Sequence, residues 1–361
     1  MPSRSALQFI SEKSLRLLAL LALTGVAQGL CGCATVSYLV QAGKGQLAIL
    51  NRARPISEVL KDEKLASQTR LLLESVEGIK KFGEERGGLK PTRNYADYVA
   101  LGRPAANWVV SASLPLKFEA KQWSFPIVGS FTYLGWFELT DANAHAEKLK
   151  AEGLDVYVRG AGAYSTLGWF KDPIFSSMLG EGEAAIAHLA NVILHESVHA
   201  TIYIPDQSTF NESLASFIAD ELTLVYLRER FGLGSSTEKA YLGDGAAGEE
   251  REKRFHEVHT ALAGLYASNA SDLEKTQKKA DILEELKKKT SWKRELNNAV
   301  LIQYATYGTG KVSFDGVLKK CAADWKRFVV RLGRLSKKDF PAAQASDFSA
   351  LLKSIEDAGC G

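Results

Sequence analysis

The chain has 361 residues, 46% of them hydrophobic, and a formal net charge of +3 at neutral pH. A chain of this length and apolar content can bury a sizeable core, in one large domain or in two lobes. A charge so close to zero provides no electrostatic basis for binding nucleic acid or an anionic surface. We therefore expect a globular protein whose function lies in a defined site, with no nucleic-acid partner.

The first 32 residues have the pattern of a bacterial lipoprotein signal peptide. Three basic residues precede an apolar run at 17–26, which is too short to span a membrane comfortably. The sequence Leu-Cys-Gly-Cys at 30–33 then resembles a lipobox, in which Cys33 would be lipidated because the small Gly32 precedes it. A plain secretory signal cleaved nearby and a retained anchor are the alternatives.

Ala34 follows Cys33 at the position where an inner-membrane retention signal would place Asp. By analogy this favours the outer membrane, with the protein facing the periplasm. Removal of residues 1–32 would lower the net charge from +3 to +1, because that segment holds three basic residues and one acidic residue. Attachment to the membrane would then come from acyl chains, and more than one chain makes such an anchor stable.

The first part of the mature chain is predicted to be helical. Its apolar residues indicate three helices, at 35–53, 56–61 and 64–85. Pro55 stops the first helix, and Gly87-Gly88 interrupts the pattern after the third.

Residues 107–165 differ from the helical part in composition. Short runs rich in β-branched or aromatic residues, separated by Pro and Gly, predict strands at 108–110, 118–125, 127–133 and 156–158. Between the last two, Thr140-Asp141 is predicted to cap a helix that ends at Gly153.

The segment 164–173, Tyr-Ser-Thr-Leu-Gly-Trp-Phe-Lys-Asp-Pro, has two interpretations. It could be the wall or lid of a cleft, with Trp169 and Phe170 forming an apolar subsite. It could equally be a packed turn in which Gly168 supplies the bend and Asp172-Pro173 ends it. Both remain open at this point.

The most informative motif is His-Glu-Ser-Val-His at 195–199, whose apolar flanks contain no Pro or Gly, as a half-buried helix requires. On a helix His195 and His199 lie one turn apart on one face, so both imidazoles can bind one metal ion. Glu196 lies beside them, placed to take a proton from water. The alternative is an ordinary amphipathic helix whose histidines are core residues.

Glu212 follows His199 by thirteen residues and is the candidate third ligand. Two histidines and a carboxylate leave one tetrahedral position open, as in a catalytic zinc site. The run from Thr209 to Glu212 also fits a capping box, in which the Glu side chain bonds the N-cap amide. The two roles compete for one carboxylate. We favour the ligand, because a two-histidine site otherwise lacks a third protein donor.

The run His195-Glu196-Ser197-Val198-His199, followed by Asn211-Glu212-Ser213-Leu214-Ala215, resembles the gluzincin pattern of zinc peptidases. Together with the signal peptide and segment 164–173, it resembles the putative zinc aminopeptidase family of proteobacterial lipoproteins, over about 33–307. The resemblance implies an α+β, predominantly helical, zincin-like fold. In such a fold a small twisted sheet packs on the motif helix, one edge strand holds substrate backbone, and the C-terminal part is helical.

The most polar stretch, 248–295, has apolar residues at helical spacing and predicts an antiparallel pair of helices. His256 and His259 lie there without the full metal motif, so we predict surface positions for both. His145 and His188 are assigned to packing or solvent.

Two further assignments concern the C-terminal third. Tyr307, in the aromatic segment 297–308, is the candidate donor to the oxyanion of a tetrahedral intermediate. The alternative is that Tyr304 and Tyr307 simply pack on a helix. Cys321 and Cys360 could form a disulfide or remain two thiols, since connectivity needs a geometry that sequence does not supply.

These observations predict a Zn²⁺-dependent peptidase with a peptide substrate. His195, His199 and Glu212 would bind the metal and Glu196 would act as general base. The resemblance favours an aminopeptidase. A membrane-anchored endopeptidase acting on envelope proteins or peptidoglycan peptides is the closest alternative, and a scaffolding or chaperone lipoprotein with a relic metal site is the second.

The predicted domain covers 33–361. It is divided into N-terminal helices, a sheet-containing part, and active-site helices with a helical C-terminal part, at 33–106, 107–180 and 181–361. Protein partners other than the substrate are not predicted.

Overall fold

The computed structural model describes residues 33–125, 129–166, 170–308 and 310–360. The predicted signal peptide lies outside these residues. The chain divides into two compact units, Met1–Asn51 and Arg52–Gly361. In the first, helix α2 (Cys33–Arg52) confirms the helix predicted at 35–53. No helix in the described part of the chain is both long and apolar enough to cross a membrane.

The second unit begins with two of the predicted helices, α3 (Ile56–Val59) and α4 (Ser67–Glu85). A three-stranded sheet that the sequence did not predict packs next to α3. Its strands are β1 (Arg54–Pro55), β2 (Asp97–Val99) and β8 (Ile174–Phe175), with β2 in the centre. Strands of two or three residues are too short to show an alternating pattern, which explains why they were missed.

The predicted sheet is present, with different strand limits. Its order is β6-β3-β7, formed by β3 (Asn107–Ser113), β6 (Tyr133–Trp136) and β7 (Asp155–Ala161), all pairs antiparallel. The strands β4 (Trp123–Phe125) and β5 (Gly129–Phe131) form a separate hairpin. The strand expected at 118–125 is therefore shorter, and Phe118 instead stacks on His259 with ring centroids 3.8 Å apart.

One face of this sheet is covered by α5 (Leu139–Ala151). The helix buries Ala142, Ala146 and Leu149 against β3 and β7, and His145 packs beside Trp136. The predicted cap was wrong: the N-cap residue is Glu138, whose side chain makes no capping bond.

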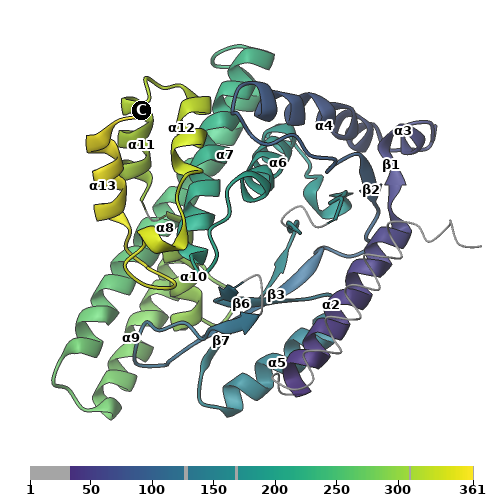
Figure 1. The fold of residues 1–361 in the computed structure, drawn as a ribbon. Coiled ribbons are helices and arrows are strands. Elements are labelled where there is room, and N and C mark those ends of the chain that lie inside the picture. Colours follow the sequence, from purple (N-terminus) through teal and green to yellow (C-terminus); the bar gives the residue numbers. More distant parts are fainter. Residues whose placement is uncertain (1–32, 126–128, 167–169, 309, 361) are drawn as a thin grey trace, which may run out of the picture. The chain divides into compact units, whose positions relative to one another are not determined.

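The motif helix is α6 (Ala185–Thr201), followed by α7 (Ser208–Phe231). Helix α6 packs mainly on α7 and α4, whereas the sheet β6-β3-β7 packs on α5 and α10 (Asn298–Gly308). Helix α10 contacts both the sheet and α7, as Figure 1 shows. The expectation that this sheet packs directly on the motif helix is thus corrected, because the main helical neighbours of the sheet are α5 and α10, and those of α6 are α7 and α4.

The antiparallel helix pair predicted at 248–295 is confirmed by α8 (Ser236–Ala267) and α9 (Asp272–Thr290), which lie side by side (Figure 1). Their apolar faces bury Phe255, Leu262, Leu283 and Leu286 in one cluster. His256 is exposed, as predicted, while His259 is half-buried against Phe118.

The C-terminal part is helical, with α11 (Lys311–Lys320), α12 (Trp325–Leu332) and α13 (Ser349–Ala358). Two 3-10 turns complete the elements, η2 (Ser176–Met178) and η3 (Lys337–Asp339). Cys321 and Cys360 form a disulfide with Cα atoms 5.0 Å apart, which ties the chain end to α11 across 39 residues. Of the two alternatives, a disulfide or two free thiols, the structure therefore contains the disulfide.

Candidate metal centre

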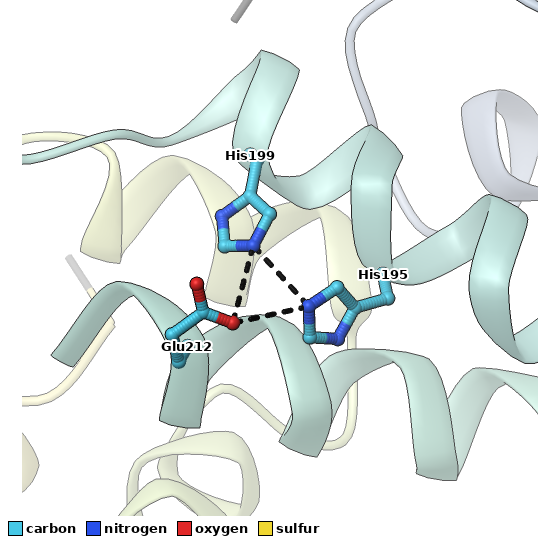
Figure 2. Close-up of side chains that lie close together, drawn as sticks. All are labelled: His195, His199 and Glu212. Atoms are coloured by element: carbon cyan, nitrogen blue, oxygen red, sulfur yellow. Dashed lines mark hydrogen bonds and ion pairs between the residues drawn. The ribbon is translucent and has the colours of Figure 1, made fainter. Parts of the chain in front are cut away.

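Helix α6 presents the motif side chains because its other faces are apolar and buried. Ile193, Leu194 and Val198 face the core. His195 and His199, one turn apart, project toward the start of α7 (Figure 2). Glu196 is half-buried and interacts electrostatically with both histidines. The helix ends at Thr201, where Ile202 adopts an extended conformation and turns the chain toward α7.

Asn211 fixes the connection between the two helices. Its side-chain oxygen accepts a hydrogen bond from the Ile204 backbone N at 3.0 Å, and its amide group donates to the Ile204 carbonyl at 2.8 Å. The buried Asn side chain therefore supplies hydrogen-bond partners to the backbone N and carbonyl of Ile204, which would otherwise lack them. This clamp holds the first turn of α7 against α6, and the next residue along the helix is Glu212.

Gln344, in the C-terminal part of the chain, also bonds to the α6–α7 connection. The backbone N of Gln344 donates to the Asp206 carbonyl at 2.6 Å, and its side-chain amide donates to the Ser130 carbonyl at 2.8 Å. Asp206 in turn accepts from the backbone N of Ser130 at 2.8 Å. Strand β5 is thus bonded to the α6–α7 connection, and Tyr133 follows only two residues after β5 ends.

Glu212 points at the histidine pair and not at its own helix end. Figure 2 shows the three side chains converging. Its Oε2 lies 3.4 Å from His195 Nε2 and 3.6 Å from His199 Nε2, and the two Nε2 atoms are 3.2 Å apart. Helix α7 has Gln207 at its N-cap and no side-chain capping bond. The capping-box alternative for Glu212 is therefore excluded.

These separations fit a tetrahedral metal site. Ligand bonds of about 2.0–2.1 Å at tetrahedral angles place two donor atoms about 3.3–3.4 Å apart. The three measured distances, 3.2, 3.4 and 3.6 Å, lie around that value. All three side chains are largely buried, so together they could hold one metal ion.

Charge within the group is arranged for a cation. Burial alone would raise the pKa of Glu212, but His199 and the hydrogen bonds from both histidines outweigh it and hold that pKa well below its usual range. The carboxylate is therefore ionised, and the same pairing raises the pKa of His199 against the effect of burial, so a bound metal would displace a proton from that imidazole. Burial also raises the pKa of Glu196, although His195 and His199 oppose the rise. A carboxyl group shifted upward in this way is better suited to accept and return a proton near neutral pH.

Tyr133 completes the site from a distant strand. Its hydroxyl donates to Glu212 Oε1 at 3.2 Å, which leaves Oε2 turned toward the histidines. The two residues are 79 positions apart, and nothing in the local sequence distinguishes this tyrosine from others in the sheet. The sequence prediction missed it for that reason.

Replacing Tyr133 by Phe should weaken metal binding without abolishing it. Loss of a hydrogen bond that orients a metal-binding carboxylate typically costs about 10–100-fold in affinity. Competition with a chelating indicator measures the affinity. The control is Tyr266→Phe, which removes a bond to Asn298 elsewhere in the protein and should leave metal affinity unchanged. Equal affinity for Tyr133→Phe and the native protein would contradict the assignment.

Two buried residues, Tyr95 and Asp172, interact electrostatically with Glu196. Tyr95 is buried, and its backbone N donates to the Asp172 carbonyl at 2.7 Å. The Asp172 carboxylate accepts bonds from Thr166 N and Oγ1, at 3.0 and 2.7 Å. Burial raises the pKa of Asp172 to about 6, with the Thr166 bonds opposing the rise and Glu196 adding to it.

These bonds join Thr166 to Asp172, at the two ends of the segment 164–173. The described residues of the segment, 164–166 and 170–173, therefore support the packed-turn interpretation. Gly168 and Trp169 lie outside the described residues, so their predicted roles as bend and subsite remain predictions.

The remaining predicted site residues have different outcomes. Tyr304 packs on Phe255 with ring centroids 4.2 Å apart, in agreement with the packing alternative. Tyr307 belongs to α10, but its side chain is outside the described residues, so its role stays a prediction. The side chain of Cys33 is also outside them. His188 is exposed and contacts Asp244 at 2.9 Å, away from the metal group.

Comparison with known proteins identifies a family. A model of a family described as putative aminopeptidase matches residues 37–346. The chain belongs to this family. The matched region contains α6, α7 and all three candidate ligands, and the family description indicates peptidase activity. No match was found among curated proteins or among solved structures.

Proposed function

We propose that the protein is a zinc-dependent aminopeptidase. The observation that carries the proposal is the convergence of His195, His199 and Glu212 at tetrahedral spacing, in a chain that belongs to a peptidase family. Two nitrogen donors and one carboxylate oxygen form the ligand set that catalytic zinc prefers, and they leave one position open. The choice of an aminopeptidase over an endopeptidase rests on the family description.

His195, His199 and Glu212 would hold the zinc ion. When bound, zinc supplies Lewis acidity that polarises a peptide carbonyl and lowers the pKa of water. Glu196 would take the proton from the attacking water and deliver it to the amine that leaves, because its carboxyl has a raised pKa and lies beside both histidines. Tyr133 holds the Glu212 carboxylate in position. Tyr307 remains the candidate donor to the oxyanion.

The place of action is proposed on sequence alone. Acylation of Cys33 would attach the protein to the periplasmic face of the outer membrane, where peptides released in the envelope are the available substrates. The apolar run at 17–26 and the small Gly32 before Cys33 support this part of the proposal.

Removal of the metal tests the function directly. The purified protein should contain about one zinc per chain, and a chelator should abolish its cleavage of a peptide library, with activity restored by added zinc. Peptides with free and with acetylated N-termini separate the two peptidase classes, since an aminopeptidase requires the free amine. Protein without zinc and without cleavage, even after zinc is added, would refute the proposal and favour a scaffold.

A further inference from the structure

A small pocket borders the metal group. It is lined by Glu212 and Tyr133 on the metal side, by Ser111 and Ala112 of β3 with the nearby Ala120, and by Ala299 and Ile302 of α10. Thr132 and Gln303 complete the lining, and five of the nine lining residues are Ser, Thr or Ala. Because Glu212 forms one wall, a substrate bound at the metal would place a neighbouring group into or across this space.

The walls of the pocket are held firmly in place. Asn298 at the start of α10 donates to the carbonyls of Leu114 and Pro115, at 2.9 and 3.1 Å. Asn297 donates to the Val156 carbonyl of β7 at 2.9 Å. Both Asn side chains are buried, so moving α10 away from the sheet would break several buried hydrogen bonds. The start of α10, which carries Ala299, is therefore held against the sheet.

The pocket is too small for a large side chain. Its volume is about 20 Å³, which is room for one or two water molecules at about 10–15 Å³ each. A side chain with one or two heavy atoms fits such a space. Leu or Phe would require Ala299 or Ile302 to move, which the bonds of α10 oppose.

The pocket also contains a polar group that needs a partner. Ser111 Oγ is buried and has no hydrogen-bond partner among the described residues. A buried hydroxyl without a partner is unfavourable unless a ligand or water molecule bonds to it. A serine side chain in the pocket would supply that bond, whereas an alanine side chain would fill the space without it.

We propose that this pocket selects a serine or alanine residue next to the bond that is cleaved, with Ala299 and Ile302 limiting size and Ser111 binding the serine hydroxyl. The proposal rests on the proposed peptidase function and names its substrate class. Peptides with a small residue at that position are the substrates, and peptides with a large apolar residue there are excluded.

Two series of peptides with free N-termini test the selection. Each series carries Ser, Ala, Leu or Phe at one of the two residues that flank the cleaved bond, and kcat/KM is measured with the zinc-loaded full-length protein. In one series, Ser and Ala should be cleaved at least about tenfold better than Leu and Phe, because a few methylenes in a rigid pocket have effects of that size. Equal cleavage of all four residues in both series would overturn the proposal.

Variants of the pocket give a second measurement. Ile302→Ala should raise the Leu/Ala ratio of kcat/KM by about tenfold or more. Ser111→Ala should lower the Ser/Ala ratio by about two- to tenfold while the protein stays folded. The matched control is Ile282→Ala, a partly buried isoleucine of α9 outside the pocket, which should change neither ratio.

The outcomes separate this proposal from the function on which it rests. Unchanged ratios in Ile302→Ala and Ser111→Ala, in an enzyme that still cleaves peptides, would refute the pocket alone. Absence of zinc-dependent cleavage of every peptide by the native protein would refute the peptidase function, and the selection with it.

Discussion

Replacing Glu196 by Gln should abolish peptide hydrolysis while zinc stays bound. Gln has nearly the same shape, so the helix and both histidines keep their positions, but its amide cannot accept a proton near neutral pH. General-base catalysis typically contributes about 10²–10⁴ in rate, so kcat should fall by at least about 100-fold. Zinc content of the purified variant and kcat on a cleaved peptide are the two measurements.

The control for this variant is Glu183→Gln, which changes an exposed carboxylate just before α6. It should keep both zinc and activity, which shows that losing a carboxylate near the helix is not enough. A Glu196→Gln protein with normal turnover would remove Glu196 from the mechanism. A variant that lost zinc as well would show that Glu196 acts through the metal group, and its role as base would then lack support.

Replacing His195 by Ala should remove both metal and activity. The remaining pair, His199 and Glu212, offers only two donors, whereas catalytic zinc sites have three from the protein. The loss of affinity should exceed the roughly 10–100-fold expected when only a supporting hydrogen bond is removed, as in Tyr133→Phe. Metal analysis after dialysis and peptide cleavage with excess zinc measure the two effects.

His188→Ala is the matched control, because His188 lies on the same helix but is exposed and contacts Asp244. It should bind zinc and cleave peptides as the native protein does. If His195→Ala retained one zinc per chain and native turnover, the metal group formed by α6 and α7 would not be the active site.

Several helices, including the motif helix α6, could be predicted because their signals are local. Helical periodicity depends on residues three and four positions apart, so α6 and the pair α8 and α9 are visible in the sequence alone. The same periodicity places His195 and His199 on one face of α6. Strands of two or three residues, such as β1 and β8, have no comparable local signal and were missed.

The sequence by itself determined the two histidines, the acid beside them and the residue type of the third ligand. Only the tertiary structure decided that the Glu212 carboxylate faces the histidines instead of capping its helix, since a capping box and a ligand have the same sequence pattern. The hydrogen bonds between Asn211 and Ile204 hold the start of α7 in this orientation, as do those that join Gln344, Ser130 and Asp206. The contacts of Tyr133 with Glu212 and of Cys321 with Cys360 join residues 79 and 39 positions apart. Such pairs depend on how whole elements pack, which no local pattern encodes.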